Sequence, residues 1–408
     1  MHAYLKTPFS KILAIICKKC VDSHKILCII SLANRLAEGG VVITIKDIAK
    51  AAGVSTATVS YVINGTKYVT PEKRQQVLDI ITKTGYQPNT VAKSLRTKKT
   101  NSIGVLVEDI LAFATPRIIN GISEYMENTD YHILLNDLRM MESLFNRYDQ
   151  IIHQKDKINN GLTYLVYGAK VDAVIYVGMF DRDVSGIIPD IGKPVIIAYS
   201  TSEDAHTCYV TYENENVSAQ MMRNLIEARH RRIAVITGPA HTTPTLLRLK
   251  GIQKAFAEAG LSLDHNLVKN GDWERDSGYL RMKEILSHAK PTAVFAMNDL
   301  MAVGAMDAIK EAGLRVPQDI SVVGFDNREV SEYVSPKLTT AEIDLKAIGF
   351  TAAQVAAEKL AGTDLKCIQE KSGATNGSGF AESKTTDGHK IIIPSNIILR
   401  DSVRNLIV

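Results

Sequence analysis

The spacing of apolar positions along the chain changes near residue 101. From residue 44 to residue 96, apolar side chains recur every three or four positions, which indicates amphipathic helices. Beyond residue 101, short β-branched runs alternate with helix-like stretches, which is typical of parallel sheets with crossover helices. More than six such units exceed one ordinary sheet. We therefore expect a helical first part followed by two α/β lobes.

The expected strands of the second part lie at residues 102–109, 131–135, 173–177, 195–199, 233–237, 293–297 and 320–325. Helix-like sequence is found at residues 116–129, 216–228, 245–259 and 300–312. Residues 372–388 are rich in Gly, Ser, Thr and Asn, so we expect a flexible surface loop there. Ligands of open α/β sheets bind at the carboxyl ends of strands, and between two lobes this position is the cleft.

Capping residues divide the first part into three helices. Thr44 is the expected N-cap of the first helix, and Gly53 has the freedom to adopt the positive φ of a tight turn after it. Ser55 caps a second helix, predicted over residues 56–63. Thr70, followed by a proline, begins a third. Two helices joined by a short turn that contains glycine form the unit that places its second helix in the major groove of DNA.

Positive charge is concentrated in this first part. Residues 44–101 contain ten Lys and Arg against three Asp and Glu, a net charge of +7, whereas the whole chain is only +4. A local basic surplus is what binding to phosphates requires. A small helical bundle with a solvated basic face has the same pattern, so charge and helices alone leave both interpretations open.

The first part resembles the headpiece and hinge of the lactose-repressor and purine-repressor (LacI/GalR) family of bacterial regulators. Two runs carry the resemblance, TIKDIAKAAGVSTATVSYVINGTKYVTPEKRQQV and GYQPNTVAKSLR, and it continues over about residues 44–404. It implies a cytoplasmic, sequence-specific transcriptional regulator, a repressor, that binds double-stranded operator DNA. It also implies control by a small-molecule effector, a sugar or related metabolite or a nucleobase-like compound, and a homodimer or tetramer on a pseudo-palindromic operator.

DNA-binding roles follow from the resemblance by matched position. Positions early in the second helix are expected to read bases: Thr56, Ala57 and Tyr61. Neighbouring positions are expected to hold phosphates: Ser55, Thr58 and Asn64. In the hinge helix, Leu95 is expected to wedge into the minor groove and unstack a base step. Three further hinge residues would line the same groove: Ala92, Lys93 and Ser94.

The fold that the resemblance implies is an all-α helix-turn-helix headpiece with a hinge helix, joined to a two-lobed α/β effector domain. That domain is Rossmann-like and of the periplasmic-binding-protein type. The expected domains are residues 44–88 for the headpiece, 89–101 for the hinge and linker, and 102–408 for effector binding and dimerisation. Crossings between the lobes are expected near Thr211, Pro317 and Asp344. The first lobe would then contain residues 102–210 and 318–344, and the second residues 211–317 and 345–408.

Effector-binding roles also come from the resemblance. Asp299 matches a carboxylate that accepts hydroxyls or ring nitrogens, and Arg248 matches a cleft arginine whose fork suits a carboxylate, phosphate or hydroxyl pair. Trp273 matches an aromatic residue that stacks on the ligand. Weaker matches are Asn298, Asp326 and Thr115. Two alternatives stay open: Asp299 as a helix cap, and Trp273 as part of a lobe core.

The other wall of the cleft departs from the family pattern. Residues 111–116 read LAFATP where many members have a stretch like Asn-Pro-Phe-Phe. Glu213 and Asn214 replace a frequent Asp-Asn pair, and Tyr199 stands where an acid is common. These changes leave the identity of the effector open, although not the expectation of a cleft.

Residues 1–43 form an N-terminal extension. Their apolar runs are too short for a membrane-spanning helix and are interrupted by charges, which also argues against a signal peptide. Cys17, Cys20, His24 and Cys28 have a spacing close to a zinc knuckle without matching one. We favour another hypothesis, that a start site has been misplaced and the native chain begins at residue 41, 42 or 43. N-terminal sequencing of the native protein tests it.

Enzyme motifs are missing from the sequence. It contains no G-x-x-x-x-G-K-[ST] loop, no G-x-S-x-G elbow, no H-E-x-x-H and no G-x-G-x-x-G after a strand. Its five cysteines give no disulfide framework, which favours a reducing cytoplasm. We therefore expect a regulator that is not an enzyme and has no cofactor or metal. A solute-binding protein and an architectural DNA-binding protein are the rival classes.

Overall fold

The structure is a computed structural model that describes residues 43–86, 99–144, 150–362, 384–387 and 390–405. Of residues 384–387, it describes the backbone alone. The chain divides into two units, one up to Lys98 and one from Lys99 onward. Each unit is described by itself. The predicted hinge residues 92–95 and the cysteines of residues 17–28 lie outside the described residues.

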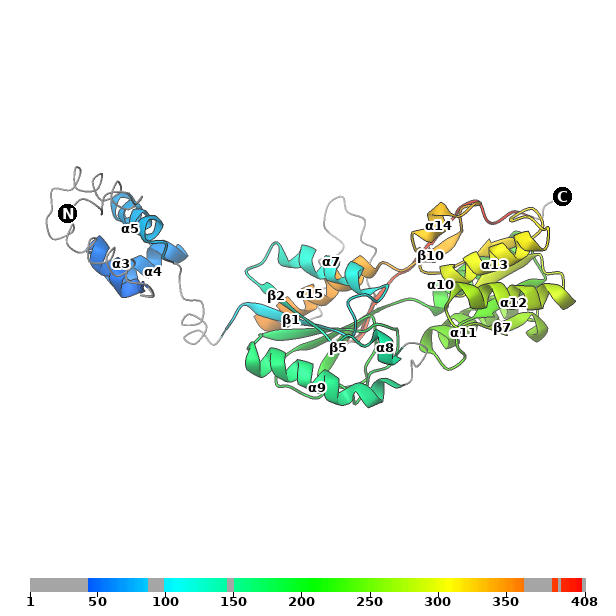
Figure 1. Ribbon diagram of the computed structural model, residues 1–408, viewed down its shortest axis with the longest axis horizontal. Helices are drawn as coiled ribbons and strands as arrows, with labels where there is room; N and C mark the ends of the chain where they lie inside the picture. Colours follow the sequence, from blue (N-terminus) through cyan, green and yellow to red (C-terminus); the bar gives the residue numbers. More distant parts are fainter. Residues whose placement is uncertain (1–42, 87–98, 145–149, 363–383, 388–389, 406–408) are drawn as a thin grey trace, which may run out of the picture. The chain divides into compact units, whose positions relative to one another are not determined.

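The first unit contains three helices, α3 (Ile45–Ala52), α4 (Thr56–Asn64) and α5 (Pro71–Thr84) (Figure 1). Both predicted N-caps of α3 and α4 are in place. Thr44 donates through its backbone N–H and its hydroxyl to the Asp47 carboxylate, at 2.9 and 2.7 Å. The Ser55 hydroxyl accepts from the Thr58 N–H at 3.0 Å. Gly53 has φ 62°, as the turn between the two helices requires.

These helices enclose a small apolar core. It is formed by one face of each helix and consists of Ile48, Ala49, Ala51, Ala52, Val59, Val62, Val77 and Ile80. The apolar side chains that recur every three or four positions therefore supply this core. In α4, only Val59 and Val62 are buried.

The first lobe of the second unit is built on a seven-stranded sheet, in the order β11-β12-β5-β4-β3-β1-β2. Its strands are β1 (Ser102–Val107), β2 (His132–Asp137), β3 (Ala173–Val177), β4 (Val195–Ala198), β5 (Thr207–Tyr212), β11 (Lys384–Asp387) and β12 (Lys390–Ile393). All neighbours are parallel except β11 and β12. The central strands are buried on both faces, so their sequences are continuously apolar.

Helices cover both faces of this sheet. On one face lie α7 (Thr115–Met126) and α15 (Leu345–Ala361), and on the other α8 (Met141–Leu144), η1 (Gln150–Gln154), α9 (Lys155–Thr163) and the π-helical turn η2 (Tyr164–Gly168). The helices α7 and α15 pack closely because glycines meet backbone there. A Cβ on Gly121 would lie 2.0 Å from the Lys346 carbonyl oxygen, and one on Gly349 would lie 1.9 Å from that of Ile118.

The second lobe has a four-stranded parallel sheet, in the order β7-β6-β8-β9. Its strands are β6 (Ile233–Thr237), β7 (Val268–Asn270), β8 (Ala293–Ala296) and β9 (Ser321–Val323). Its helices are α10 (Glu215–Glu227), α11 (Thr243–Glu258), η3 (His265–Leu267), α12 (Arg275–His288), α13 (Asp299–Glu311) and α14 (Val330–Tyr333). An antiparallel pair, β10 (Thr340–Glu342) and β13 (Asn396–Ile398), completes the lobe.

The predicted division between the lobes is wrong in its later part. Residues 318–344 belong to the second lobe, because β9 pairs with β8 in that sheet. Residues 345–361, 384–387 and 390–393 belong to the first, because α15 packs on α7, β12 pairs with β5, and β11 pairs with β12. The chain crosses after β5, near Asp344, and between β12 and β13. Pro317 is therefore not a crossing point.

The predicted loop over residues 372–388 is also partly wrong, because β11 adds an antiparallel strand at the sheet edge there. Within the described ranges, no helix is long and apolar enough to cross a membrane. The same ranges contain no cluster of three or more His, Cys, Asp or Glu side chains suited to a metal ion.

Candidate effector site and DNA-binding helix

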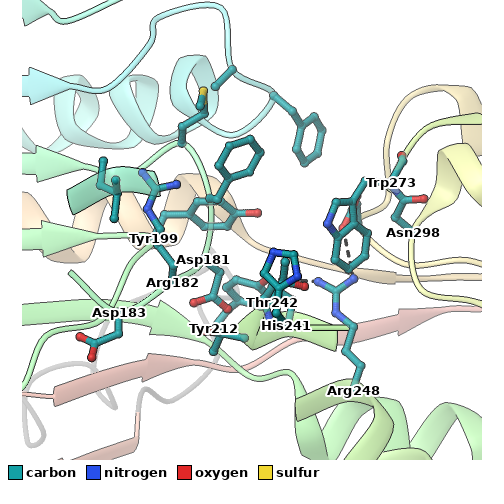
Figure 2. A pocket seen from close by; sticks show the side chains of 18 of the residues that line it. Asp181, Arg182, Asp183, Tyr199, Tyr212, His241, Thr242, Arg248, Trp273 and Asn298 are labelled. Atoms are coloured by element: carbon teal, nitrogen blue, oxygen red, sulfur yellow. Dashed lines mark hydrogen bonds and ion pairs between the residues drawn. The ribbon is translucent and has the colours of Figure 1, made fainter. Parts of the chain in front are cut away.

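A cavity of about 420 Å³ lies between the two lobes, where the carboxyl ends of their strands meet (Figure 2). The first lobe contributes residues that include Phe113, Phe180, Asp181, Arg182, Tyr199 and Tyr212. The second contributes residues that include His241, Thr242, Arg248, Trp273, Asn298, Asp326 and Arg328. Four of the six predicted effector residues therefore line one cavity: Arg248, Trp273, Asn298 and Asp326. The other two, Asp299 and Thr115, are not among its lining residues.

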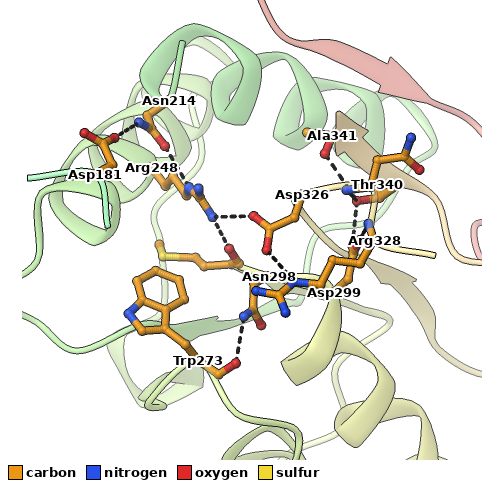
Figure 3. Close-up of polar contacts among 12 residues, drawn as sticks. Asp181, Asn214, Arg248, Trp273, Asn298, Asp299, Asp326, Arg328, Thr340 and Ala341 are labelled. Atoms are coloured by element: carbon orange, nitrogen blue, oxygen red, sulfur yellow. Dashed lines mark hydrogen bonds and ion pairs between the residues drawn. The ribbon is translucent and has the colours of Figure 1, made fainter. Parts of the chain in front are cut away.

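Arg248 of α11 is fixed by hydrogen bonds on several sides (Figure 3). Its Nε donates to the Asn214 side-chain oxygen at 2.8 Å, its Nη2 to the Tyr212 hydroxyl at 3.1 Å, and its Nη1 to the Met297 carbonyl. The guanidinium also lies 3.5 Å above the centre of the Phe325 ring. Arg248 therefore ties the second lobe to the end of β5 and to the crossing that follows it.

Asp326 lies beside this arginine at the end of the β9 segment. Its two carboxylate oxygens face Arg248 Nη1 at 3.8 Å and Arg328 Nε at 3.2 Å. Burial raises the pKa of Asp326, and the two guanidinium groups oppose that rise. The cavity wall thus combines positive and negative groups that largely balance one another.

Trp273 presents its indole to the cavity from the loop before α12. Its backbone has φ 76°, and its carbonyl accepts from the Asn298 amide at 2.7 Å. The ring packs against Gly238, where a Cβ would lie 2.0 Å from the indole. The half-buried Trp273 therefore packs against the lobe core on one side and lines the cavity on the other, so both interpretations of this residue hold in part.

Asp299, predicted to contact the effector, is fully buried behind the cavity wall. Its Oδ1 accepts from the Thr340 hydroxyl at 2.6 Å, and its Oδ2 accepts from the Arg328 N–H at 2.7 Å. Burial, with a contribution from the charge of Asp326, raises the pKa of Asp299 to about 8. The helix cap is Asn298, whose side-chain oxygen accepts from the Met301 N–H at 2.8 Å. Asp299 thus holds the loop that carries Arg328, and it is not among the residues that line the cavity.

Thr115, the other prediction that lies away from the cavity, is the first residue of α7 and is fully buried. Its hydroxyl oxygen has no hydrogen-bond partner among the described residues. Its neighbours Ala112 and Phe113 line the cavity instead. The stretch LAFATP therefore contributes to the site through its earlier residues.

Sequence reasoning missed the Asp181–Arg182 pair. Both residues follow β3, and this position at a strand's carboxyl end was the available signal. Asp181 accepts from the Asn214 amide at 2.8 Å, and burial raises its pKa to about 6. Nearby, the rings of Tyr199 and Tyr212 stack with centres 5.5 Å apart and an interplanar angle of 15°. Their rings and the indole of Trp273 add flat surface to a lining that also contains apolar residues such as Phe113, Met179 and Phe180.

The predicted DNA-reading positions lie on α4 of the headpiece. Thr56 and Ala57 are exposed at its first turn, and Tyr61 is half-buried, with Lys67 Nζ 5.2 Å from the centre of its ring. Asn64 donates to the Ser60 carbonyl at 2.8 Å, and Ser55 and Thr58 share a hydrogen bond at 2.9 Å. The accessible face of α4 is therefore short and polar.

Comparison with known proteins identifies the family that combines such a three-helix unit with a two-lobed unit. Residues 44–89 match the family described as "Bacterial regulatory proteins, lacI family", and residues 222–373 match "Periplasmic binding protein-like domain". The HTH-type transcriptional repressor PurR of Pasteurella multocida is 34% identical over 320 residues, covering 78% of this chain and 92% of the relative. The chain belongs to the LacI family. A second PurR, from Photobacterium profundum, is 31% identical and covers 78% of this chain and 92% of its own.

Solved structures of LacI-family regulators share the fold. The lac repressor dimer bound to operator and the anti-inducer ONPF matches with a TM-score of 0.66 at 24% identity, covering 89% of this chain and 99% of that one. The transcriptional regulator CelR in complex with cellobiose matches with a TM-score of 0.57 at 26% identity, covering 88% and 99%. The predicted family and fold class are confirmed. This LacI-family protein is a DNA-binding transcriptional regulator under the control of a small-molecule effector, and it is not an enzyme.

Proposed function

We propose that this LacI-family repressor binds a pseudo-palindromic operator as a homodimer and is switched by a sugar or nucleobase-like effector in the interlobe cavity. The observation that carries the proposal is the cavity itself. Its lining brings Arg248 and Asp326 of one lobe together with Asp181 and Arg182 of the other. A molecule that contacts both sets has a different affinity for each arrangement of the lobes.

The size and lining of the cavity fit a compact polar ligand with a flat face. A volume of about 420 Å³ is in the range of small-molecule sites. Trp273 and the Tyr199–Tyr212 stack offer surfaces for a sugar or base ring, and the charged and amide groups offer donors and acceptors around its edge. The related CelR is a cellobiose complex, which supports a carbohydrate as one of the two candidates.

On the DNA side, Thr56, Ala57 and Tyr61 of α4 are proposed to face base edges in the major groove. Ser55, Thr58 and Asn64 are proposed to hold phosphates, and the hinge residues Ala92, Lys93, Ser94 and Leu95 to bind in the minor groove. The two-fold symmetry of a dimer matches two half-sites. Because α4 offers few bidentate contacts to bases, DNA shape and the hinge carry a large share of the specificity.

Coupling between the two sites follows from linkage. An effector shifts the equilibrium between two arrangements of the lobes only by the difference in its affinity for them. We propose that a change in lobe arrangement reaches the hinge, because the expected hinge and linker, residues 89–101, lead directly into β1 of the first lobe. The lobe arrangement that the effector favours then either stabilises or melts the hinge helices on DNA.

An electrophoretic mobility shift tests this function. The full chain is mixed with the DNA upstream of its own gene and with a scrambled duplex, in the presence and absence of cellobiose, maltose, ribose, hypoxanthine and guanine. We expect a specific shift whose midpoint one of these compounds changes. Trp273→Ala should weaken the response to that compound, whereas Tyr333→Ala, at a position 78% exposed, should leave it unchanged. Equal binding to both duplexes would contradict the proposal.

A further inference from the structure

A buried ion pair holds one arginine in the first-lobe wall of the cavity. Glu108, the residue after β1, is fully buried and accepts from three donors. These are the Met179 N–H at 2.9 Å, the Arg182 Nη2 at 2.5 Å and the Tyr176 hydroxyl. Arg182 is therefore fixed by a carboxylate that lies behind it, and its charge is balanced there.

The guanidinium of Arg182 has donors left over. The residue lines the cavity and is only 7% exposed, yet its Nε and Nη1 have no hydrogen-bond partner among the described residues. Unpaired N–H groups of a buried charged side chain are unfavourable. An acceptor atom of a bound molecule would satisfy them, which makes this wall more than a packing surface.

Asp181, the residue before Arg182, also lines the cavity, and its carboxylate lies apart from the Arg182 guanidinium (Figure 2). Its Oδ2 is bound by the Asn214 amide, whereas its Oδ1 has no partner among the described residues. The Arg182 charge is matched by Glu108, so Asp181 forms no ion pair with it, and its charge is opposed only through space by the guanidinium of Arg248. Asp183, which also lines the cavity, adds to the negative charge. A ligand anion placed here would meet net repulsion.

We propose that Asp181 and Arg182 form a specificity-determining subsite for a neutral donor–acceptor pair of the effector. An oxygen of the effector accepts from Arg182, and an O–H or N–H elsewhere on the effector donates to Asp181. The hydroxyls of a sugar and the carbonyl and N–H groups of a nucleobase both have this chemistry. Effectors with a carboxylate or phosphate at this end are rejected. This inference rests on the proposed function, since it specifies which ligands the cavity accepts.

Matched pairs of probes test the subsite. Binding to the full chain is followed by the fluorescence of Trp273, the single tryptophan of the sequence. The pairs are cellobiose with cellobionate, ribose with ribose 5-phosphate, and hypoxanthine with inosine 5′-monophosphate. We expect the neutral member of the binding pair to bind at least tenfold more tightly than its acidic partner. Asp181→Asn should reduce this difference in affinity, because it removes the negative charge of Asp181.

Arg182→Lys tests the second half of the subsite without leaving Glu108 unpaired. Lysine keeps a positive charge beside Glu108 but lacks the fork of N–H groups, so binding of the neutral probe should weaken about tenfold. The control Arg275→Lys changes an exposed arginine of α12 that pairs with Asp307, and it should change nothing. Thermal unfolding of each variant shows that the fold persists.

The outcomes separate the two proposals. Tighter binding of an acidic probe, or neutral binding that Arg182→Lys leaves unchanged in a folded protein, overturns the subsite and leaves the proposed function standing. If no probe changes the fluorescence of Trp273 or the binding of operator, the proposed function fails, and the subsite fails with it.

Discussion

Phe113 and Arg328 stack across the effector cavity, with the guanidinium carbon of Arg328 lying 3.9 Å from the centre of the Phe113 ring. Phe113 belongs to the first lobe, and Arg328 to the second, where it also pairs with Asp326 at 3.2 Å. The contact therefore joins the two lobes at the site itself. A cation–π contact of this kind is worth on the order of 1 kcal/mol.

Phe113→Ala should loosen the arrangement of the lobes seen here. A change of about 1 kcal/mol in that equilibrium corresponds to a roughly fivefold change in the effector concentration at half-response. Operator binding is measured as a function of effector for the wild type, Phe113→Ala and the control Phe113→Tyr, which keeps the aromatic face. The contact has no role in switching if the alanine and tyrosine variants respond at the same concentration as the wild type.

Asp299→Asn should stabilise the protein increasingly as pH rises. Burial raises the pKa of Asp299 to about 8, so the folded chain keeps a proton that the unfolded chain loses near pH 4. The contribution of Asp299 to stability therefore falls between about pH 4 and pH 8. Asparagine does not ionise and can still form hydrogen bonds with the Thr340 hydroxyl and the Arg328 N–H.

Urea unfolding at pH 5, 7 and 8.5 measures this effect. The advantage of Asp299→Asn over the wild type should grow with pH, to the order of a few kcal/mol. Asp276→Asn is the control, because that side chain is 88% exposed. A constant difference across the three pH values would show that Asp299 is not held in its protonated form.

Ser55 combines a structural role with a proposed DNA contact, and two substitutions separate them. Ser55→Ala removes the cap of α4 and should cost the headpiece about 1 kcal/mol. Ser55→Asp keeps a capping oxygen but places a negative charge where a phosphate is proposed to bind. We expect the aspartate variant to unfold at the wild-type temperature and to lose operator affinity. Full operator binding by that variant would exclude the phosphate contact.

Leu95→Ala tests the hinge wedge inferred from the sequence. Loss of the side chain should weaken binding to the specific operator far more than binding to a scrambled duplex, because only the specific complex includes the unstacked base step. Leu78→Ala, a change at a half-exposed apolar residue of α5, serves as the control. Fluorescence anisotropy on both duplexes gives the two affinities, and equal losses would count against the wedge.

Local signals in the sequence predicted the headpiece well. Caps at Thr44 and Ser55 and the glycine at residue 53 set the helix boundaries through contacts within a few residues, so the sequence contains them directly. In the lobes, the run at residues 233–237 also gave β6 residue for residue. Which sheet a strand joins depends on long-range pairing. That is why β9 and α15 were assigned to the wrong lobes.

The site shows the same contrast between local and long-range information. The resemblance located Arg248 and Trp273, which line the cavity. It could not decide which of two consecutive residues, Asn298 or Asp299, faces the cavity. Asn298 caps α13 with an extended backbone, whereas Asp299 is the first residue of that helix, so their side chains point in different directions. Asn298 therefore reaches the cavity while Asp299 points behind its wall. Asp181 and Arg182 lie in a stretch for which the family pattern gave no role, and only the folded arrangement shows their unpaired atoms.

The central claim is that ligand binding in the interlobe cavity controls DNA binding by the headpiece. The most direct test follows Trp273 fluorescence and operator anisotropy in one sample, as the effector found in the mobility-shift screen is added. Because binding at the two sites is linked, fluorescence and anisotropy should change over the same range of effector concentration. The Trp273→Phe variant should lose the fluorescence signal, whereas its anisotropy signal should keep a midpoint near that of the wild type. A change in operator affinity at effector concentrations that leave Trp273 unaffected would contradict the account.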